Sequence, residues 1–231
     1  MESTCSSPNL TRNNKKSLSA MVHDILLDQI CSQQLSPGTS LKRRDVAASL
    51  GVSYAPVVEA FVQLELEGFL VTIPRKGTVV RSFGIESIRE NLFLREALEC
   101  EAARLYCGQP VIDHFDHLLC LGEKIDATFS QENPKNWKLE YAFHSELVAL
   151  SDCPLLLQEF NRTMKLDLFY DIYNFVFTNG HSYPMLDKHS SLLEKLKTKN
   201  PDEAEKAIRF HLGTSIFMVL KNYKDKKNNQ E

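Results

Sequence analysis

Residues 37–80 read PGTSLKRRDVAASLGVSYAPVVEAFVQLELEGFLVTIPRKGTVV, and this stretch decides the fold of the first part of the chain. Its turn signals and apolar spacing predict two short helices, a tight turn at Gly51 between them, and a small hairpin after Gly68. The hairpin tip is Pro74-Arg75-Lys76-Gly77, which carries two cations. This order of elements predicts a winged helix-turn-helix, whose second helix enters a DNA major groove.

The ends of these helices also have recognisable signals. Ser40 is expected to cap the first helix, and Gly51 to end it. Ser53 is a suitable N-cap for the second helix, and Pro56 fits its first turn. Upstream, apolar residues recur at helical spacing from Leu18 onward and predict one more helix before the turn at Pro37-Gly38.

The charge of the chain is uneven. Its net charge of −3 argues against a non-specific nucleic-acid binder, but residues 1–80 carry eight Lys/Arg against seven Asp/Glu. The cations of this part cluster where DNA contact is expected, although a hairpin with ordinary solvated charges remains the alternative for the tip. The predicted DNA-contacting residues are Lys42, Arg43, Arg44, Ser53, Tyr54, Ala55, Arg75, Lys76 and Gly77.

Composition limits the class of protein. The chain has 231 residues, 43% of them hydrophobic, and no apolar run near the roughly 18 residues of a membrane span. The polar N-terminus lacks a signal-peptide core, and the six cysteines contain no CxxC pair. We therefore expect a cytoplasmic protein with reduced thiols and no membrane contact.

The pattern becomes helical after residue 82 and remains so. We expect a disordered tail at 1–16, the winged helix-turn-helix at 17–82, an all-α bundle at 83–225 and a polar tail at 226–231. The fold class is thus mainly α, with a six- or seven-helix bundle as the second domain. The predicted helices of the bundle cover residues 85–107, 110–129, 134–151, 154–177, 183–198 and 201–223.

Three histidines lie on apolar helix faces of this bundle. His144, His189 and His211 each share a face with aliphatic residues, and Glu140 stands one turn before His144. A single buried histidine is most often a core residue with a hydrogen-bond partner. Three on separate helices, with a carboxylate, indicate a centre for Zn, Ni, Mn or Fe. His114 and His117 lie among acidic residues near a helix start, and a solvated face explains them better.

Arg95 and Glu99 stand one turn apart on a largely apolar helix. An intrahelical salt bridge of little energetic weight is one interpretation. The other is that Arg95 points into the bundle and binds a ligand carboxylate, for which its planar guanidinium is suited.

The chain resembles GntR-family transcriptional regulators of the FadR-like subgroup, whose C-terminal ligand-sensing bundle is called the FCD domain. The likeness covers about residues 18–223. In the first domain it rests on Pro37-Gly38, Asp45-Val46-Ala47, Gly51-Val52-Ser53, Pro56-Val57, Glu59-Ala60, Leu64, Glu67-Gly68 and Gly77. In the second it rests on Arg95-Glu96-Ala97-Leu98-Glu99, Ala102-Ala103, Phe143-His144, Asp187-Lys188-His189 and Phe210-His211.

The resemblance implies a homodimer that binds a palindromic double-stranded DNA operator under the control of a small carboxylate metabolite. It also implies a divalent metal, zinc foremost, held by one Asp and three His. Here Glu140 takes the place of the Asp, beside His144, His189 and His211, and Arg95 is the implied effector contact. Such proteins are regulators and not enzymes.

The chain departs from the family in its reading helix, where Tyr54 and Val58 replace arginines; Arg44 does match a DNA-contacting position. Two alternatives therefore stay open. One is a metal-dependent ligand-binding protein or enzyme with a degenerate DNA-binding domain. The other is an adaptor whose winged domain binds a protein partner.

Overall fold

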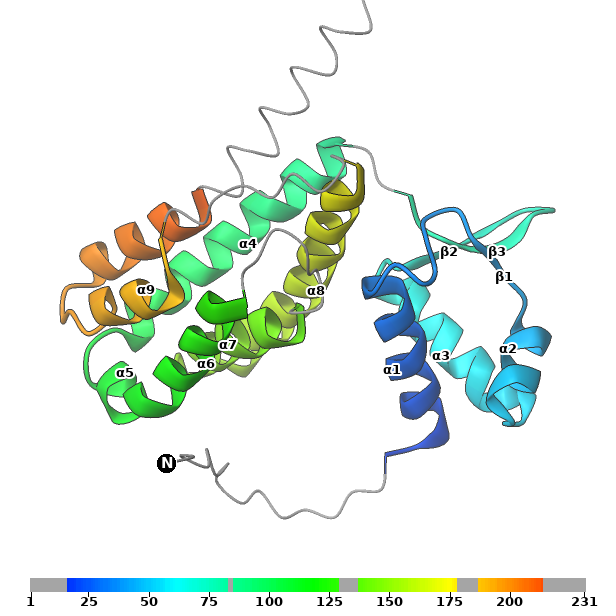
Figure 1. Ribbon diagram of the computed structural model, residues 1–231, viewed down its shortest axis with the longest axis horizontal. Helices are drawn as coiled ribbons and strands as arrows, with labels where there is room; N and C mark the ends of the chain where they lie inside the picture. The colour runs from blue at the N-terminus through cyan, green and yellow to red at the C-terminus, as the bar shows by residue number, and fades with distance from the viewer. Residues whose placement is uncertain (1–15, 83–84, 129–136, 178–186, 214–231) are drawn as a thin grey trace, which may run out of the picture. The chain divides into compact units, whose positions relative to one another are not determined.

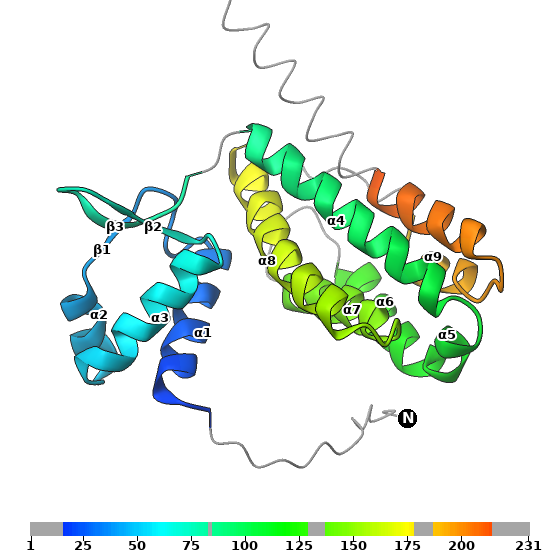
Figure 2. The ribbon, with the colours of Figure 1, turned by 180° about the vertical axis from the view of Figure 1, so that it is seen from behind.

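The computed structural model describes residues 16–82, 85–128, 137–177 and 187–213, with the backbone alone at 85, 128, 137 and 167–177. The chain divides into two compact units, residues 1–83 and 84–231 (Figures 1 and 2). The predicted tails at 1–16 and 226–231 lie outside the described residues, apart from Lys16.

The first unit is a winged helix-turn-helix. Helix α1 (Leu18–Cys31) packs along α3 (Tyr54–Leu66), and α2 (Arg43–Leu50) packs on α3 at an angle of 120°. An angle of this size is usual for the helices of a helix-turn-helix. The turn between α2 and α3 uses Gly51, whose φ of 64° is the left-handed conformation that glycine adopts without strain. The core of the unit includes Val22, Leu26, Ile30, Val57, Ala60, Phe61 and Leu64.

The wing is a three-stranded antiparallel sheet in the order β1-β3-β2. Its strands are β1 (Ser40–Leu41), β2 (Leu70–Ile73) and β3 (Gly77–Val80), and Ile73 pairs with Gly77 across the tip. The prediction that Ser40 caps α2 was wrong. Ser40 pairs with Val79 of β3, and Lys42 occupies the N-cap position, because a long-range strand pair outweighs the local capping preference.

One carboxylate joins the parts of this unit. Glu65 of α3 accepts hydrogen bonds at Oε1 from Thr72 Oγ1 of β2 at 2.5 Å and from Arg43 Nη2 of α2 at 3.4 Å. Thr78 Oγ1 of β3 lies 2.8 Å from Thr72 Oγ1 and also contacts Glu65. The side chain of Glu65 therefore connects α3 to α2 and to the wing.

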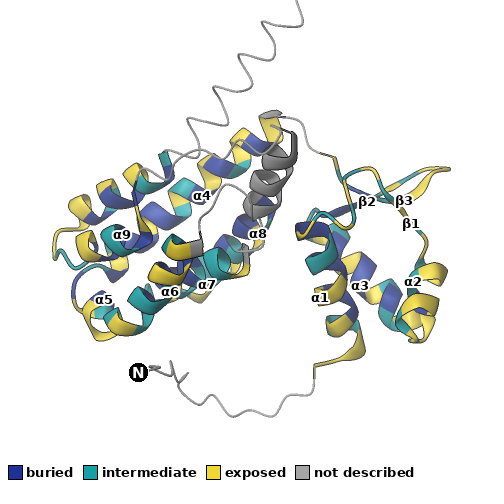
Figure 3. Ribbon diagram, in the orientation of Figure 1, coloured by how far each residue is buried: buried dark blue, intermediate teal, exposed yellow. Residues whose placement is uncertain are grey.

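The second unit is an all-α bundle. Its elements are α4 (Ile85–Tyr106), α5 (Gln109–Asp113), α6 (Phe115–Thr128), α7 (Trp137–Ala149), α8 (Pro154–Phe177), α9 (His189–Lys195) and a helix whose described part covers residues 201–213. The predicted mainly-α fold, with a winged helix-turn-helix and a helical bundle, is confirmed. Figure 3 shows the buried faces of these helices turned toward one another.

The predicted helix at 110–129 is two helices, α5 and α6, which break at His114. The ring Nδ1 of His114 lies 2.9 Å from the carbonyl oxygen of Pro110. In a continuous helix that oxygen accepts the backbone N–H of residue 114, so the side chain competes with the helix at this point. The start of the predicted helix at 183–198 lies outside the described residues, and its described part, α9, ends at Lys195.

Among the described residues, no single helix is both long enough and apolar enough to cross a membrane. In the described part of the chain, α2 and α3 meet those criteria of length and composition only when taken together, and the pair is sharply bent.

Candidate metal centre and DNA-reading face

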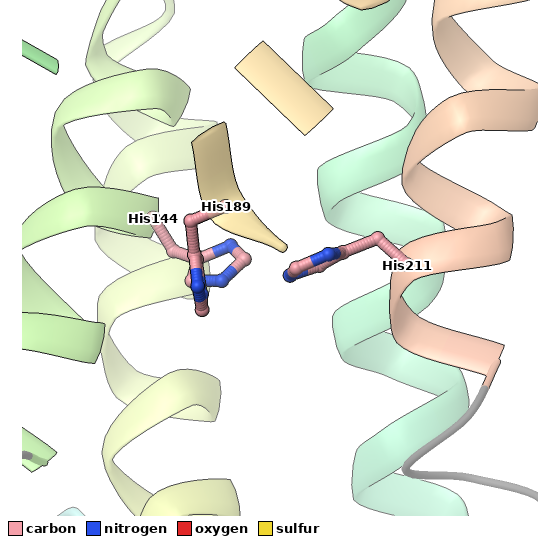
Figure 4. A group of neighbouring side chains, drawn as sticks. All are labelled: His144, His189 and His211. Atoms are coloured by element: carbon pink, nitrogen blue, oxygen red, sulfur yellow. The ribbon is translucent and has the colours of Figure 1, made fainter. Parts of the chain in front are cut away.

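Three histidine rings from separate helices of the bundle meet in its core. His144 is on α7, His189 begins α9, and His211 is on the helix at 201–213 (Figure 4). Each offers a ring nitrogen, and these three atoms lie within 4.8 Å of one another. The ring centroids are 4.8–5.6 Å apart. This clustering is what a three-histidine metal centre requires.

Glu140 adds a carboxylate to the cluster from one turn earlier on α7. Its Oε2 lies 3.0 Å from His189 Nε2 and 3.6 Å from His144 Nε2. Burial acts to raise the pKa of Glu140, but the charge and hydrogen bond of His189 outweigh that effect and lower the pKa to about 2. An ionised carboxylate therefore faces the Nε2 atoms of two imidazoles.

His144 is oriented by Glu99 of α4, whose Oε2 lies 2.6 Å from His144 Nδ1. Arg95 Nε donates to the other oxygen of Glu99 at 2.7 Å, and all three side chains are buried. Burial acts to raise the pKa of Glu99, but the charges of His144 and Arg95 lower it to about 2. Because an ionised carboxylate can only accept, His144 Nδ1 carries a proton and donates. This arrangement directs Nε2 of His144 toward Glu140.

His189 is oriented by Asp126 of α6. Asp126 Oδ1 lies 3.1 Å from His189 Nδ1 and also accepts the backbone N–H of His189 at 3.0 Å. The Oδ2 atom accepts from both the backbone and the hydroxyl of Ser190. Burial acts to lower the pKa of His189, but Glu140 and Asp126 raise it to about 9. Without a metal, His189 is therefore an imidazolium between two carboxylates at neutral pH.

Helices α6 and α9 approach closely at Gly122. A Cβ at this position would lie 3.1 Å from the Cβ of His189, which is tighter than most Cβ contacts in proteins. Gly122 stands one turn before Asp126, so the absence of a side chain there favours the approach of His189 to that carboxylate.

His211 differs from the other two histidines. Its Nδ1 atom is buried and has no hydrogen-bond partner among the described residues. Burial, followed by the charges of His144 and His189, lowers the pKa of His211 to about 3. It is thus a neutral imidazole in the protein at neutral pH, and a neutral imidazole is the form that binds metals.

These residues fit a divalent metal. The unpartnered Nδ1 of His211 is a polar atom that burial penalises unless something binds there. The other two histidines each have one nitrogen held by a carboxylate, which is the usual arrangement around metal-bound imidazoles. Three imidazoles and a carboxylate are donors suited to Zn, Ni, Mn or Fe.

The other histidine pair of the bundle lies elsewhere. His117 Nε2 contacts Glu146 at 2.6 Å on a partly exposed surface, and His114 is exposed beside Pro110. Neither belongs to the cluster.

In the winged unit, most of the predicted DNA contacts are on the surface. Lys42, Arg44, Arg75 and Lys76 are exposed, as are Ser53, Tyr54, Ala55 and Gly77. Arg43 is the exception, because its guanidinium lies 4.8 Å from the centroid of the Phe61 ring and contacts Glu65.

The sequence did not predict the contacts that two residues, Glu99 and Asp126, make with the histidines. Glu99 was considered only as a partner of Arg95, and Asp126 was not considered. The signal for Asp126 is its position one turn from Gly122 in a helix with a strongly apolar face, where a carboxylate needs a buried partner.

The winged helix-turn-helix and the helical bundle together define the class as a two-domain DNA-binding regulator. Comparison with known families agrees, since residues 18–80 match "Bacterial regulatory proteins, gntR family" and residues 90–214 match "FCD domain". The chain therefore belongs to the GntR family of transcriptional regulators and carries an FCD domain.

Individual relatives carry names of the same kind. The chain is 25% identical over 203 residues to the "HTH-type transcriptional repressor RspR" of Escherichia coli, covering 87% of this chain and 88% of that protein. It is also 25% identical over 215 residues to the "Probable D-xylose utilization operon transcriptional repressor" of Paenarthrobacter nicotinovorans, covering 89% and 90%. The matched families and relatives are transcriptional regulators and not enzymes.

Solved structures share the fold. A putative GntR regulator from Rhodococcus sp. RHA1 has a TM-score of 0.67 at 21% identity, covering 89% of this chain and 99% of that one. E. coli McbR/YncC has a TM-score of 0.67 at 19% identity, covering 90% and 99%.

Proposed function

We propose that this regulator changes its affinity for an operator when a small carboxylate metabolite binds at a divalent metal in the bundle. The observation that carries the proposal is the pair of carboxylate-oriented imidazoles, His144 with Glu99 and His189 with Asp126. In both, the protein fixes Nδ1 and directs Nε2 to one shared point beside Glu140. Core histidines with a purely structural role would not need to direct their Nε2 atoms to one point.

His144, His189, His211 and Glu140 would hold the metal, with zinc as the first choice and nickel, manganese or iron as alternatives. When bound, a divalent cation at this site supplies a Lewis acid to which a carboxylate oxygen can bind. The chain's own residues set its charge. With one ionised carboxylate among its ligands, the ion would keep part of its positive charge toward a further anionic ligand.

Arg95 is the second proposed contact for the metabolite. Its Nε donates to Glu99, the carboxylate that also contacts His144 Nδ1. Because Glu99 also orients His144, a ligand that pulls on Arg95 is coupled through two hydrogen bonds to a metal ligand. This connection supports a single site in which the metabolite contacts both the metal and Arg95.

For DNA, we propose a homodimer on a palindromic operator in the cytoplasm. The names of two relatives include the word repressor, which makes repression the first outcome to test. The metabolite alters operator affinity only if it binds one arrangement of the dimer more tightly than the other.

Elemental analysis of the purified protein tests the metal. We expect about one divalent ion per chain in the wild type, and strong loss in His144→Ala, His189→Ala and His211→Ala. His117→Ala is the matched control, because His117 also pairs with a carboxylate but lies outside the cluster. Equal metal content in all five proteins would refute the site.

Fluorescence anisotropy with DNA from the protein's own promoter region tests control by the metabolite. We expect a panel of small di- and tricarboxylates to shift the operator Kd for the metal-loaded protein. The shift should disappear in Arg95→Lys, which keeps the charge but loses the planar fork. An unchanged shift in the chelated protein would mean that the metabolite binds elsewhere.

A further inference from the structure

The recognition helix α3 has an apolar stripe on its exposed side, beside the exposed polar residues Glu59 and Gln63. Tyr54 is 51% exposed and Val62 is 47% exposed, and half-buried Val58 lies between them. The three recur at every fourth residue, so they form one stripe along the helix. The helix contains no lysine, arginine or histidine, and its only charged residues are Glu59 and Glu65.

The exposed cations of this unit lie on other elements than α3. Lys42 and Arg44 are exposed at the start of α2, and Arg75 and Lys76 are exposed at the tip of the wing. Among the described residues none of these four has an ion-pair partner. They are therefore available to phosphates, whereas Arg43 has its charge offset by Glu65.

The exposed cations indicate which class of partner the apolar stripe contacts. An exposed apolar stripe alone suits a protein partner as well as any other. Here the stripe starts in the first turn of the second helix of a helix-turn-helix, which is the end that meets base edges. The exposed cations of α2 and the wing complement phosphates, and DNA is the occupant that satisfies both features.

We propose that Tyr54, Ala55 and Val58 read the C5-methyl groups of thymines in the major groove. The thymine methyl is the apolar group that a base pair displays there, and small apolar or aromatic side chains contact it. Because α3 carries no arginine or lysine for the bidentate contact to guanine, we expect A·T base pairs to face its first two turns. The inference rests on the DNA-binding class of the chain and is independent of the proposed metal.

The test begins with selection of binding sites by the full-length protein from a random 30-base-pair library. The selected duplex is then prepared with thymine or with deoxyuridine, which lacks only the methyl group. We expect A·T pairs at the positions facing α3. Each uracil there should weaken binding about fourfold, by the transfer cost of one methyl group. Uracils placed outside the half-sites should leave the Kd unchanged.

Two protein variants test which residue causes the effect of uracil on the Kd. In Val58→Ala we expect the ratio of the uracil Kd to the thymine Kd to fall toward one. Val62→Ala is the matched control, since it removes the same group from the same stripe one turn beyond the proposed contacts, and its ratio should stay that of the wild type. The deoxyuridine comparison on the unmodified protein does not depend on the folding of any variant.

Three results would overturn the proposal. Selected sites that contain G·C at these positions would exclude it, as would wild-type binding that is indifferent to uracil. Enrichment of no sequence would exclude it together with specific DNA binding, and would assign the stripe to a protein partner. The first two results leave the regulatory function intact.

Discussion

Charged side chains lie in the core of the bundle, whereas an apolar stripe lies on the exposed side of α3 in the winged unit. Around the three histidines, Glu99, Asp126 and Glu140 supply fixed carboxylates within hydrogen-bond distance. Along α3, the proposed contacts to bases are Tyr54 and Val58, and the exposed cations lie on α2 and on the wing. We propose that the difference reflects the ligands, because a small cation is selected by preorganised charge and a methyl group by shape and desolvation.

Of the predicted effects, the loss of stability on removal of Glu99 should be the largest. The Glu99→Ala variant deletes the carboxylate shared by buried Arg95 and His144, and we expect a loss of about 3–5 kcal/mol in the free energy of unfolding. Trp137, the only tryptophan of the chain, is on α7, so urea unfolding followed by its fluorescence reports on the bundle.

The control for that experiment is Glu159→Ala. Glu159 pairs with Arg162 on an exposed surface, and its loss should cost less than about 1 kcal/mol. If the two variants unfold at the same urea concentration, the buried charges do not stabilise the bundle as described.

The next largest expected effect is a loss of stability of the metal-free protein as the pH rises. The pKa of His189 is about 9 in the folded protein and about 6.5 when unfolded, so its stabilising contribution is complete below pH 6.5. That contribution is lost as the pH rises to 9, and it amounts to about 3 kcal/mol. Urea unfolding between pH 6.5 and 9 measures the loss, which should be absent in His189→Gln.

Asp126→Asn should act on the metal rather than on the fold. The amide keeps the size of the side chain but loses the charge that orients His189. We expect metal affinity to drop about 10- to 100-fold, measured by competition with a chromophoric chelator. Asp113→Asn, on the exposed helix α5, is the control, and an equal drop in both variants would contradict an orienting role.

The smallest expected effect is on DNA binding by Arg44, an exposed cation at the start of α2. Arg44→Ala should weaken binding to every duplex and reduce the slope of log Kd against log salt by about 0.9, the loss of one phosphate contact. Arg43→Ala should leave the slope unchanged, because its guanidinium is held by Glu65 and Phe61. Equal slopes for both variants would mean that Arg44 does not reach a phosphate.

How far sequence alone could predict this molecule depends on how local each feature is. His144, His189 and His211 could be found because helical periodicity places each on an apolar face. Their hydrogen-bond partners could not be predicted in the same way. Asp126 lies 63 residues from His189, and helical periodicity does not indicate that the two side chains are in contact. The error at Ser40 has the same cause, since its strand partner, Val79, is distant in the chain.

The hydrogen bonds of Glu65 also bear on how a signal could act. Because this side chain joins α3 to α2 and to both strands of the hairpin, we expect the winged unit to move as one body. In the proposed homodimer, a bound metabolite would then have little means of altering which bases each winged unit recognises. It would instead alter the distance and rotation between the two winged units, so we expect an inducer to change the permitted spacing of half-sites and not their sequence.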